Sequence, residues 1–257
     1  MVVYVRKKAK RNRYRARISK SIASTIARFR QSRYAQILKT LFFRVCIWVL
    51  VAHLFFIGLT SSLIFAYKFI NPTVSGVKVY RSYCYPWTFR KSVYLPLKQI
   101  PKKTRTMILR VEDGSFYHHH GIVLGAIKNA WKVNQAIGKT VYGGSTITMQ
   151  TARTLFLTPH KNYVRKYLEL IIAIELEVIL DKDRIFELYL NNAEWGKGVF
   201  GIEAASRHHF KKTVSALSRD ETIRLVTLLS SPIVYTPQTL KKSRILAERY
   251  RYLSERF

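Results

Sequence analysis

A stretch of 23 residues without a formal charge, from Val45 to Tyr67, constrains this chain more than any other part of its sequence. At a rise of about 1.5 Å per residue, a helix of this length spans the ~30 Å hydrocarbon core of a bilayer. The stretch exceeds the ~7 to 15 apolar residues of a secretory signal, and it ends without a small-residue cleavage site. The sequence therefore predicts an uncleaved transmembrane anchor over residues 45–67.

Positive charge is concentrated in front of this anchor. The chain has 45 Lys and Arg against 14 Asp and Glu, and residues 1–44 hold 14 of the basic residues and no acidic one. Residues 112–257 hold 21 basic and 14 acidic residues, so the excess there is only seven. A basic arm can bind nucleic acid or anionic lipid. The adjoining span favours lipid contact and orientation, so we expect a single-pass protein with a cytoplasmic arm, an outer domain after Lys68 and no nucleic-acid partner.

The rest of the chain divides into a linker, a helical domain and a tail. Residues 68–94 are rich in Tyr, Pro and basic side chains, which we interpret as a linker with short strands. Helical spacing and capping residues predict helices over 122–137, after Asn162, after Asp181 and after the capping box at Ser218. The helix over 162–180 is apolar nearly all round and is expected to be buried. We therefore expect a mostly α-helical domain over 95–240 and a basic helical tail over 241–257.

Glu112 is the first acidic residue of the chain, and 24 basic residues precede it. It stands beside Asp113 in a segment of aromatic and histidine side chains that ends at Gly121. A carboxylate in such surroundings is a candidate general base. The alternative is that both carboxylates lie on the surface and cap a helix that begins near Ile122. The three histidines over 118–120 raise metal ligation, but neighbours in sequence cannot all face one ion without strain, which favours packing or hydrogen bonding.

A glycine-rich loop from Gly143 leads into a helix that Ser145 is expected to cap. Free backbone N–H groups at a helix start suit an anion such as a phosphate, although similar caps occur in ordinary helices. Gln150 and Arg153 follow, three residues apart and on one helical face. The loop and this face are therefore a candidate phosphate site.

Glu169 is a second candidate. It lies in an apolar helix, four residues after Arg165 and three after Lys166. An ionised carboxylate in that setting needs a partner. An ordinary ion pair along the helix is the alternative reading, and Glu175 and Glu177 on the same helix are interpreted as structural.

Five segments together resemble the peptidoglycan glycosyltransferases found in class A penicillin-binding proteins and in monofunctional enzymes. The resemblance covers roughly residues 95–240. Its motifs are matched in order by Glu112, Asp113, Phe116, His119 and Gly121; by Gly143 to Gln150 except at Met149; by Arg165, Lys166, Glu169 and Ala173; by Lys182, Ile185, Glu187, Tyr189, Leu190 and Asn191, with Phe186 for Leu; and by Gly198 to Phe210, with His209 where Tyr is usual. Any one motif is weak, but five in order are specific. No sequence remains for a transpeptidase domain, so the resemblance is to the monofunctional type.

The resemblance implies a lysozyme-like, two-lobed helical domain that polymerises lipid II, with the lipid-linked nascent glycan as donor. It implies that Glu112 removes a proton from the 4-hydroxyl of the acceptor GlcNAc as that hydroxyl attacks C1 of the donor MurNAc, with inversion and release of undecaprenyl pyrophosphate. Glu169 would be a second essential carboxylate that either orients basic neighbours or holds a divalent ion. The further substrate-binding residues implied are Asp113, Phe116, His119, Gly144, Ser145, Thr146, Gln150, Arg153, Lys161, Arg165 and Lys166.

The resemblance also implies surroundings and cofactors for the reaction. A divalent cation, Mg²⁺ or Mn²⁺, is expected, with its ligands not identified. The location would be the plasma membrane, with the catalytic domain outside it, in the periplasm of a Gram-negative cell. Other cell-wall synthases are candidate partners.

Three other functions compete with this interpretation. A lytic transglycosylase would share a helical fold and a catalytic Glu, but it has no need of a pyrophosphate pocket. A non-catalytic membrane scaffold would not require both Glu112 and Glu169. A DNA-binding membrane protein would need its charge on the outer domain, where the excess is small.

Overall fold

The structure, a computed structural model, describes residues 17–29, 33–138 and 143–257. The chain divides into two compact units, residues 1–56 and residues 57–257. Residues 17–29 are helical, whereas the basic run over residues 6–11 lies outside the described residues.

All of the predicted membrane span except its last residue, Tyr67, lies in a single helix, α2 (Arg33–Ala66), which begins at Arg33 rather than at Val45. Its most apolar window has a mean hydropathy of 2.2, and none of that window is buried. Trp48 and Phe55 are each 72% exposed. A core helix of a soluble protein would bury such side chains, so the exposure is consistent with the predicted single-pass anchor.

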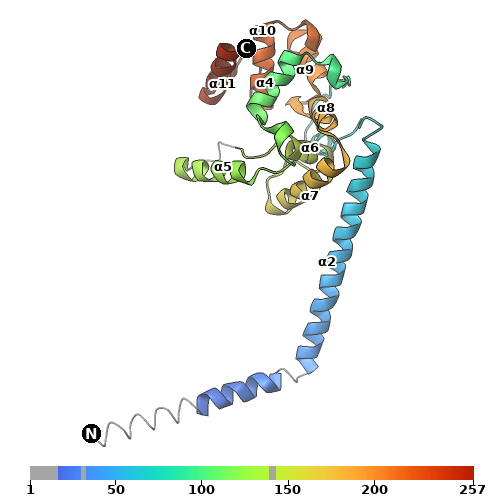
Figure 1. The fold of residues 1–257 in the computed structure, drawn as a ribbon, viewed down its shortest axis with the longest axis vertical. Coiled ribbons are helices and arrows are strands. Elements are labelled where there is room, and N and C mark those ends of the chain that lie inside the picture. The colour runs from blue at the N-terminus through green and yellow to red at the C-terminus, as the bar shows by residue number, and fades with distance from the viewer. Residues whose placement is uncertain (1–16, 30–32, 139–142) are drawn as a thin grey trace, which may run out of the picture. The chain divides into compact units, whose positions relative to one another are not determined.

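The second unit is mostly α-helical, as predicted (Figure 1). Its helices and strands are α3 (Gly76–Cys84), α4 (Lys102–Glu112), α5 (Leu124–Ile137), α6 (Ile147–Phe156), α7 (Tyr163–Ile179), α8 (Lys182–Asn192), β1 (Glu194–Gly196), β2 (Val199–Phe200), α9 (Ile202–Phe210), α10 (Arg219–Leu228) and α11 (Arg244–Arg256). Short 3₁₀ turns lie at Leu97–Gln99, Phe116–His118, Val214–Ala216 and Leu240–Lys242. Strands β1 and β2 pair antiparallel.

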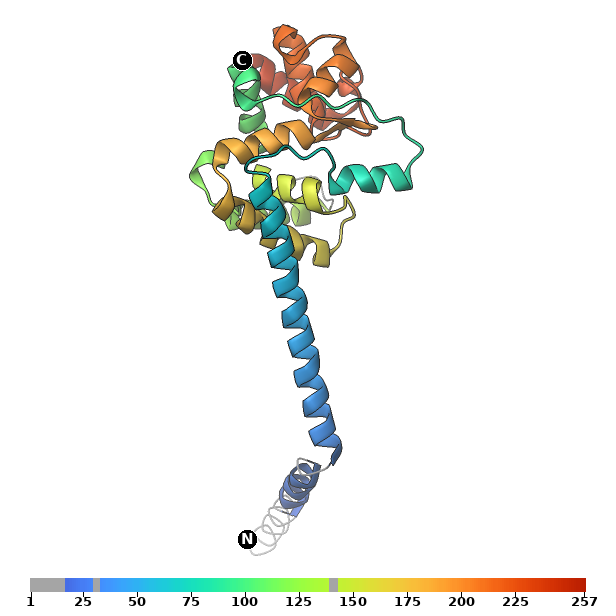
Figure 2. The ribbon, with the colours of Figure 1, turned by 90° about the vertical axis from the view of Figure 1, so that its right-hand side faces the viewer.

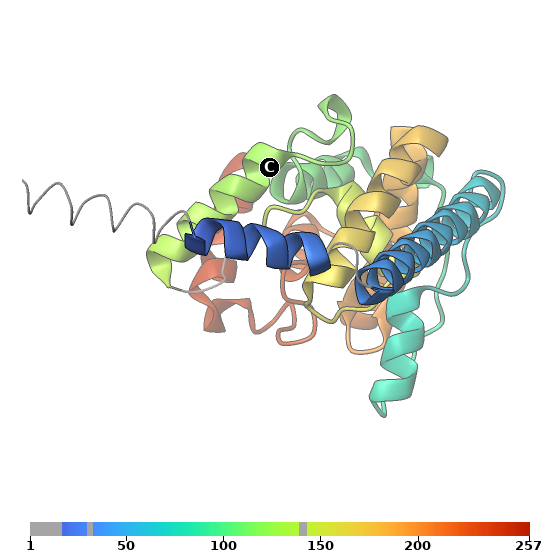
Figure 3. The same ribbon diagram turned by 90° about the horizontal axis from the view of Figure 1, so that it is seen from below.

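The helices of this unit form two groups. In one, α6 packs against α7, α8 and α3, and Figure 3 shows α6 and α7 side by side. In the other, α10 packs against α11, α4 and α9. Contacts between α8 and α9 join the groups, and Figure 2 shows the extended segment after α3 leading across this unit towards α4. The first turn of α6 and the last turn of α4 are therefore brought together from different groups.

Local caps explain where most of these helices begin. The side chains of Asn162 and Asp181 accept backbone N–H groups at the starts of α7 and α8, and Ser218 forms the predicted capping box at α10. These three predictions are confirmed. The prediction for Ser145 is wrong, because Thr146 caps α6 by accepting the N–H of Met149 at 3.1 Å.

Two further expectations differ from the structure. The predicted linker contains helix α3, and Arg81 of that helix forms a two-pronged ion pair with Glu194, at 2.9 and 3.1 Å. Helix α7 is not buried all round, since Tyr163 is 96% and Val178 80% exposed. An apolar helix need not be buried in protein if its outer face contacts another apolar medium, such as lipid.

Candidate active site

Glu112 is the last residue of α4, and its side chain is only 11% exposed. Its Oε2 accepts a hydrogen bond of 3.2 Å from Nε2 of Gln150, on α6. Its Oε1 forms an ion pair with Nη2 of Arg249, on α11. Because Glu112 is enclosed and α5 begins without a side-chain cap, the alternative of a surface capping carboxylate is wrong for this residue.

Tyr189 orients the side-chain amide of Gln150. Its hydroxyl donates a hydrogen bond of 3.3 Å to Oε1 of Gln150. Burial raises the pKa of Tyr189 well above its usual value, and the nearby Glu112 raises it further. The phenol therefore stays protonated at neutral pH, which lets it donate to Gln150 and turns the amide N–H₂ towards Glu112.

Asp113 is buried, and its carboxylate holds two other elements in place. Its Oδ2 accepts the backbone N–H of Ile147 at the start of α6, at 3.0 Å, and the ring Nε2 of His119, at 2.9 Å. The other ring nitrogen of His119 accepts the N–H of Gly121 at 3.0 Å. Since that nitrogen is an acceptor, Nε2 carries the proton and donates to Asp113. The two neighbouring carboxylates therefore have different roles: Asp113 holds the start of α6, and Glu112 faces the candidate site.

The rest of this segment contains one buried aromatic side chain and three histidines. Phe116 is buried against Phe186, with ring centres 5.8 Å apart, and Nζ of Lys182 lies 4.5 Å from the centre of its ring. His118 and His120 are exposed, whereas His119 is tied to Asp113. Of the three histidines, His119 therefore has the hydrogen-bonding role that the sequence analysis favoured.

Glu169, on α7, is fully buried and is held by two cations. Its Oε2 pairs with Nη1 of Arg165, and its Oε1 with Nζ of Lys166 at 2.6 Å. Lys166 also donates to Oγ of Ser145 at 3.0 Å. The pairs have the predicted helical spacing, and the link to Ser145 joins this cluster to the loop before α6.

Gly144 brings that loop against α5. A Cβ atom built at Gly144 would lie 2.6 Å from Cα of Ile127 and 2.8 Å from the carbonyl oxygen of Ala126. Neither backbone atom can move aside cheaply, so the close approach requires glycine. Thr146, next in the loop, is buried and donates to the carbonyl of Gly121. Gly144 and Thr146 thus shape the loop, whereas Ser145 presents its hydroxyl to Lys166.

Two basic side chains near this site, Arg153 and Lys161, are not engaged by the residues that the structure describes. Arg153 lies on α6 and is half-buried, and its side chain makes no hydrogen bond or ion pair with those residues. Lys161 is exposed before α7 and likewise has no partner among them. Because the burial of an unpaired charge is costly, a half-buried guanidinium that makes no close ion pair with the described residues suits an anionic ligand.

The donor groups do not fit a resident metal ion. No group of three or more His, Cys, Asp or Glu that could hold one occurs among the described residues. Each oxygen of Glu169 pairs with a basic side chain, and these two positive charges would repel a metal ion. Of the two roles implied for Glu169, the geometry favours the orientation of basic neighbours.

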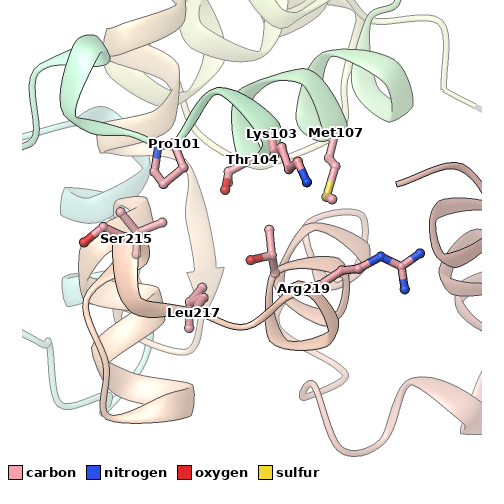
Figure 4. A pocket seen from close by; sticks show the side chains of 9 residues that line it. Pro101, Lys103, Thr104, Met107, Ser215, Leu217 and Arg219 are labelled. Carbon is pink, nitrogen blue, oxygen red and sulfur yellow. The ribbon is translucent and has the colours of Figure 1, made fainter.

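A cavity of about 230 Å³ lies at the other end of α4 from Glu112 (Figure 4). It is lined by Pro101 and Thr104 on one side and by Ser215 and Leu217 on the other, with Lys103 and Arg219 at its edge. Because it opens beside the first turn of α4, it is separate from the site at the last turn.

Arg249 is the site residue that sequence reasoning missed. It lies in the predicted tail, outside the five motifs, and no local pattern distinguishes it from the neighbouring Arg244 or Arg251. Only the packing of α11 against α10 brings it to Glu112.

The sequence of this chain is similar to those of known proteins. The family model described as Transglycosylase matches residues 82–257. A protein named biosynthetic peptidoglycan transglycosylase from Paraburkholderia xenovorans (strain LB400) is 44% identical over 161 residues, 61% of this chain and 67% of that protein. Proteins of the same name from Paraburkholderia phytofirmans and Burkholderia cenocepacia (strain HI2424) are 44% and 46% identical, over 62% and 54% of this chain and 65% and 57% of their own lengths.

The match therefore spans 57% to 67% of the length of these relatives. The family model also covers residues 241–257, which the sequence analysis placed outside the domain. The family model covers well over half of the chain and contains every candidate site residue. The chain belongs to the transglycosylase family, together with these biosynthetic peptidoglycan transglycosylases.

Proposed function

We propose that this protein polymerises lipid II into β-1,4-linked glycan strands, with the lipid-linked nascent strand as donor. Membership of the transglycosylase family makes it a peptidoglycan glycosyltransferase. Undecaprenyl pyrophosphate would be the leaving group. The relatives are named as biosynthetic enzymes, which argues against the cleavage of finished glycan.

The observation that carries the proposal is the setting of Glu112. A general base must hold its carboxylate within about 2.6 to 3.2 Å of the proton that it removes. Gln150 and Arg249 each bind one oxygen of Glu112 and restrict its rotation. An ionised carboxylate has about four acceptor positions, so two remain for the hydroxyl of an incoming sugar.

The basic side chains around α6 and α7 fit the leaving group. Departure of a pyrophosphate leaves developing negative charge that fixed cations stabilise. The side chain of Arg153 makes no ion pair with the described residues, and Lys166 still has donor capacity after binding Glu169 and Ser145. We propose that Arg153, Lys161 and Lys166 bind the donor diphosphate, and that Glu169 orients Arg165 and Lys166 rather than reacting itself.

Inversion at the donor carbon is consistent with these roles. Retention by double displacement needs a second carboxylate free to attack the sugar carbon. Glu169 is fully buried and both its oxygens are held by cations, so it does not suit that task. A single direct displacement, with Glu112 as the base, requires no covalent sugar intermediate.

A membrane anchor places this chemistry where the substrate lies. We propose that α2 crosses the plasma membrane with the N-terminus in the cytoplasm and the second unit outside. Lipid II keeps its polyprenyl tail in the bilayer, so an anchored enzyme meets it in two dimensions. Exposed apolar side chains on α5 and α7, namely Leu124, Trp131, Tyr163, Tyr167, Ile174 and Val178, are candidates for contact with the outer leaflet. Other cell-wall synthases remain proposed partners, and no step of this proposal uses a divalent cation.

The test is polymerisation of labelled lipid II by the purified full chain, followed by gel separation of the glycan strands. Glu112→Gln should abolish strand formation while the protein still folds and unfolds in a single cooperative thermal transition. Glu255→Gln is a matched control, because Glu255 is exposed on α11 and has no partner among the described residues. Strand formation by Glu112→Gln at the wild-type rate would overturn the assignment of the base.

A further inference from the structure

Helix α11 presents one face to the domain, and Arg249 lies on that face. Leu246 and Leu253 are three residues before and four residues after Arg249, so all three side chains share one side of the helix. Leu246 is 1% exposed and Leu253 is fully buried. Arg249 is carried inward with them, and its side chain is 17% exposed.

Several contacts fix α11 in this position. Leu246 forms a buried cluster with Leu228 and Leu240. The hydroxyl of Tyr250 bonds to Asp220 at the start of α10. The helix that carries Arg249 is therefore held on both sides of that residue.

The end of α11 is held as well. Arg219 donates from Nη2 to the carbonyl of Ser254 at 2.5 Å. This bond ties the last turn of α11 to the first residue of α10. A side chain mounted on so well-braced an element can fix the position of its partner.

We propose that Arg249 is a positioning residue for the reaction: α11 uses its guanidinium to fix the Glu112 carboxylate against Gln150 in the orientation that accepts the sugar proton. The inference rests on the role of Glu112 in the proposed function. Glu112 has three rotatable side-chain bonds and ends its helix, so its own backbone does not fix the carboxylate. Two donors from two other helices, Gln150 and Arg249, supply that restraint.

The same contact could instead block the base, and the geometry argues against this. Each oxygen of Glu112 receives one donor in the structure, which leaves one acceptor position free on each. Loss of Arg249 would leave Glu112 enclosed without its counter-charge and free to rotate. A positioning role therefore predicts a loss of rate on truncation, whereas a blocking role predicts a gain.

The experiment compares Arg249→Ala, Arg249→Lys and Arg251→Ala in polymerisation of labelled lipid II. Arg251 lies two positions further along α11, on the exposed side of the helix, and its side chain has no partner among the described residues. We expect Arg249→Ala to lower kcat roughly 10- to 100-fold, as for a misplaced catalytic group, with KM little changed. Arg249→Lys should recover part of kcat because it keeps the charge. Arg251→Ala should behave as the wild type.

A double-mutant cycle separates this effect from misfolding. Unfolding temperatures of Glu112→Gln, Arg249→Ala and the combined variant report whether the two side chains interact in solution. Non-additive shifts, together with the fall in kcat, support the inference. Additive shifts, an unchanged kcat, or a rise in kcat with Arg249→Ala would overturn it. If the wild type makes no strands, or if Glu112→Gln makes them, it is the proposed function that fails.

Discussion

Gln150 donates its hydrogen bond to Glu112 from the first turn of α6, only five residues after Ser145, which accepts one from Lys166. Lys166 in turn holds Glu169. The start of α6 and the loop before it therefore contact both candidate carboxylate sites. The side-chain amide of Gln150 binds Glu112, and the hydroxyl of Ser145 binds the lysine that holds Glu169. A substrate bound at this end of α6 can contact Glu112 and the basic side chains around Glu169 at the same time.

Replacement of Gln150 tests this arrangement. Gln150→Ala removes the donor from Oε2 of Glu112 and the acceptor from the Tyr189 hydroxyl. A hydrogen bond to a charged group is worth about 1.5 to 3 kcal/mol, so we expect the rate to fall roughly tenfold or more. Initial rates of strand formation from labelled lipid II measure the effect.

Gln135→Ala is the matched control, because Gln135 is exposed on α5. Gln150→Glu should be worse than Gln150→Ala, since it sets a second carboxylate beside Glu112. A Gln150→Glu variant as active as the wild type would contradict the contact.

Arg153 should matter for turnover and not for stability. Its side chain is half-buried without a hydrogen bond or ion pair to the described residues, so Arg153→Ala removes a partly buried charge that has no close partner among them. We expect an unfolding temperature equal to or above that of the wild type. If the guanidinium binds the donor diphosphate, kcat/KM should fall at least about tenfold, because a charge-assisted contact is lost.

Arg153→Lys separates charge from shape. It keeps a cation but loses the planar fork, so intermediate activity is expected. A fall in stability that matches the fall in activity would show instead that Arg153 is structural. Thermal unfolding and steady-state kinetics on the same preparations distinguish the two results.

Most helix positions could be predicted from the sequence because their signals are local. Asn162, Asp181 and Ser218 cap helices within three residues of themselves, and apolar spacing marks the runs that follow. The ion pairs of Glu169 with Arg165 and Lys166 also lie within one turn, so the spacing alone indicated them.

Contacts between distant residues could not be predicted in this way. Arg249 reaches Glu112 across 137 positions of the chain, and nothing near Arg249 in the sequence marks it. Ser145 and Thr146 are both good caps, and in the structure Thr146 caps α6 while Ser145 accepts a hydrogen bond from Lys166, 21 positions further along the chain. The apolar composition of α7 gave no sign that one of its faces is exposed, because composition does not record which medium a side chain meets.

His209, where the resemblance has Tyr, gives the fold a dependence on pH. Burial lowers the pKa of His209, and the charges of His208 and Lys211 lower it further, although a bond of 3.1 Å to the carbonyl of Trp195 opposes them. The pKa of His208 is also lowered, by burial and by Arg90 and Lys211. A lowered pKa in the folded state means that the unfolded chain takes up protons first as the pH falls below about 6.5.

Stability contributed by neutral His209 is therefore present above pH ~6.5 and is lost as the pH falls through the lower folded-state pKa. We expect the unfolding temperature of the wild type to drop between pH ~7.5 and pH ~5. His209→Tyr, which cannot take up this proton, should drop less over the same interval. Equal drops in the two proteins would show that His209 does not titrate on unfolding.

Glu175 should hold the last turns of α2 on the second unit. It is buried on α7 and accepts hydrogen bonds from Thr60, at 2.8 and 3.1 Å, and from Ser61, at 2.9 Å. No cation pairs with it among the described residues, so these hydroxyls stabilise its carboxylate. Replacing Thr60 by Val and Ser61 by Ala together would leave a buried carboxylate without these donors, at a cost of about 1 to 3 kcal/mol.

We therefore expect the Thr60→Val/Ser61→Ala protein to unfold at a lower denaturant concentration in detergent micelles. Ser62→Ala is the matched control, since Ser62 is exposed and its hydroxyl bonds, within the part of the chain that the structure describes, only to the carbonyl of Gly58 in its own helix. If the double variant and the control unfold together, Glu175 does not hold the anchor. If only the double variant is weakened, the end of the anchor is part of the folded enzyme and not a tether, because a flexible tether would transmit no change in stability to the domain.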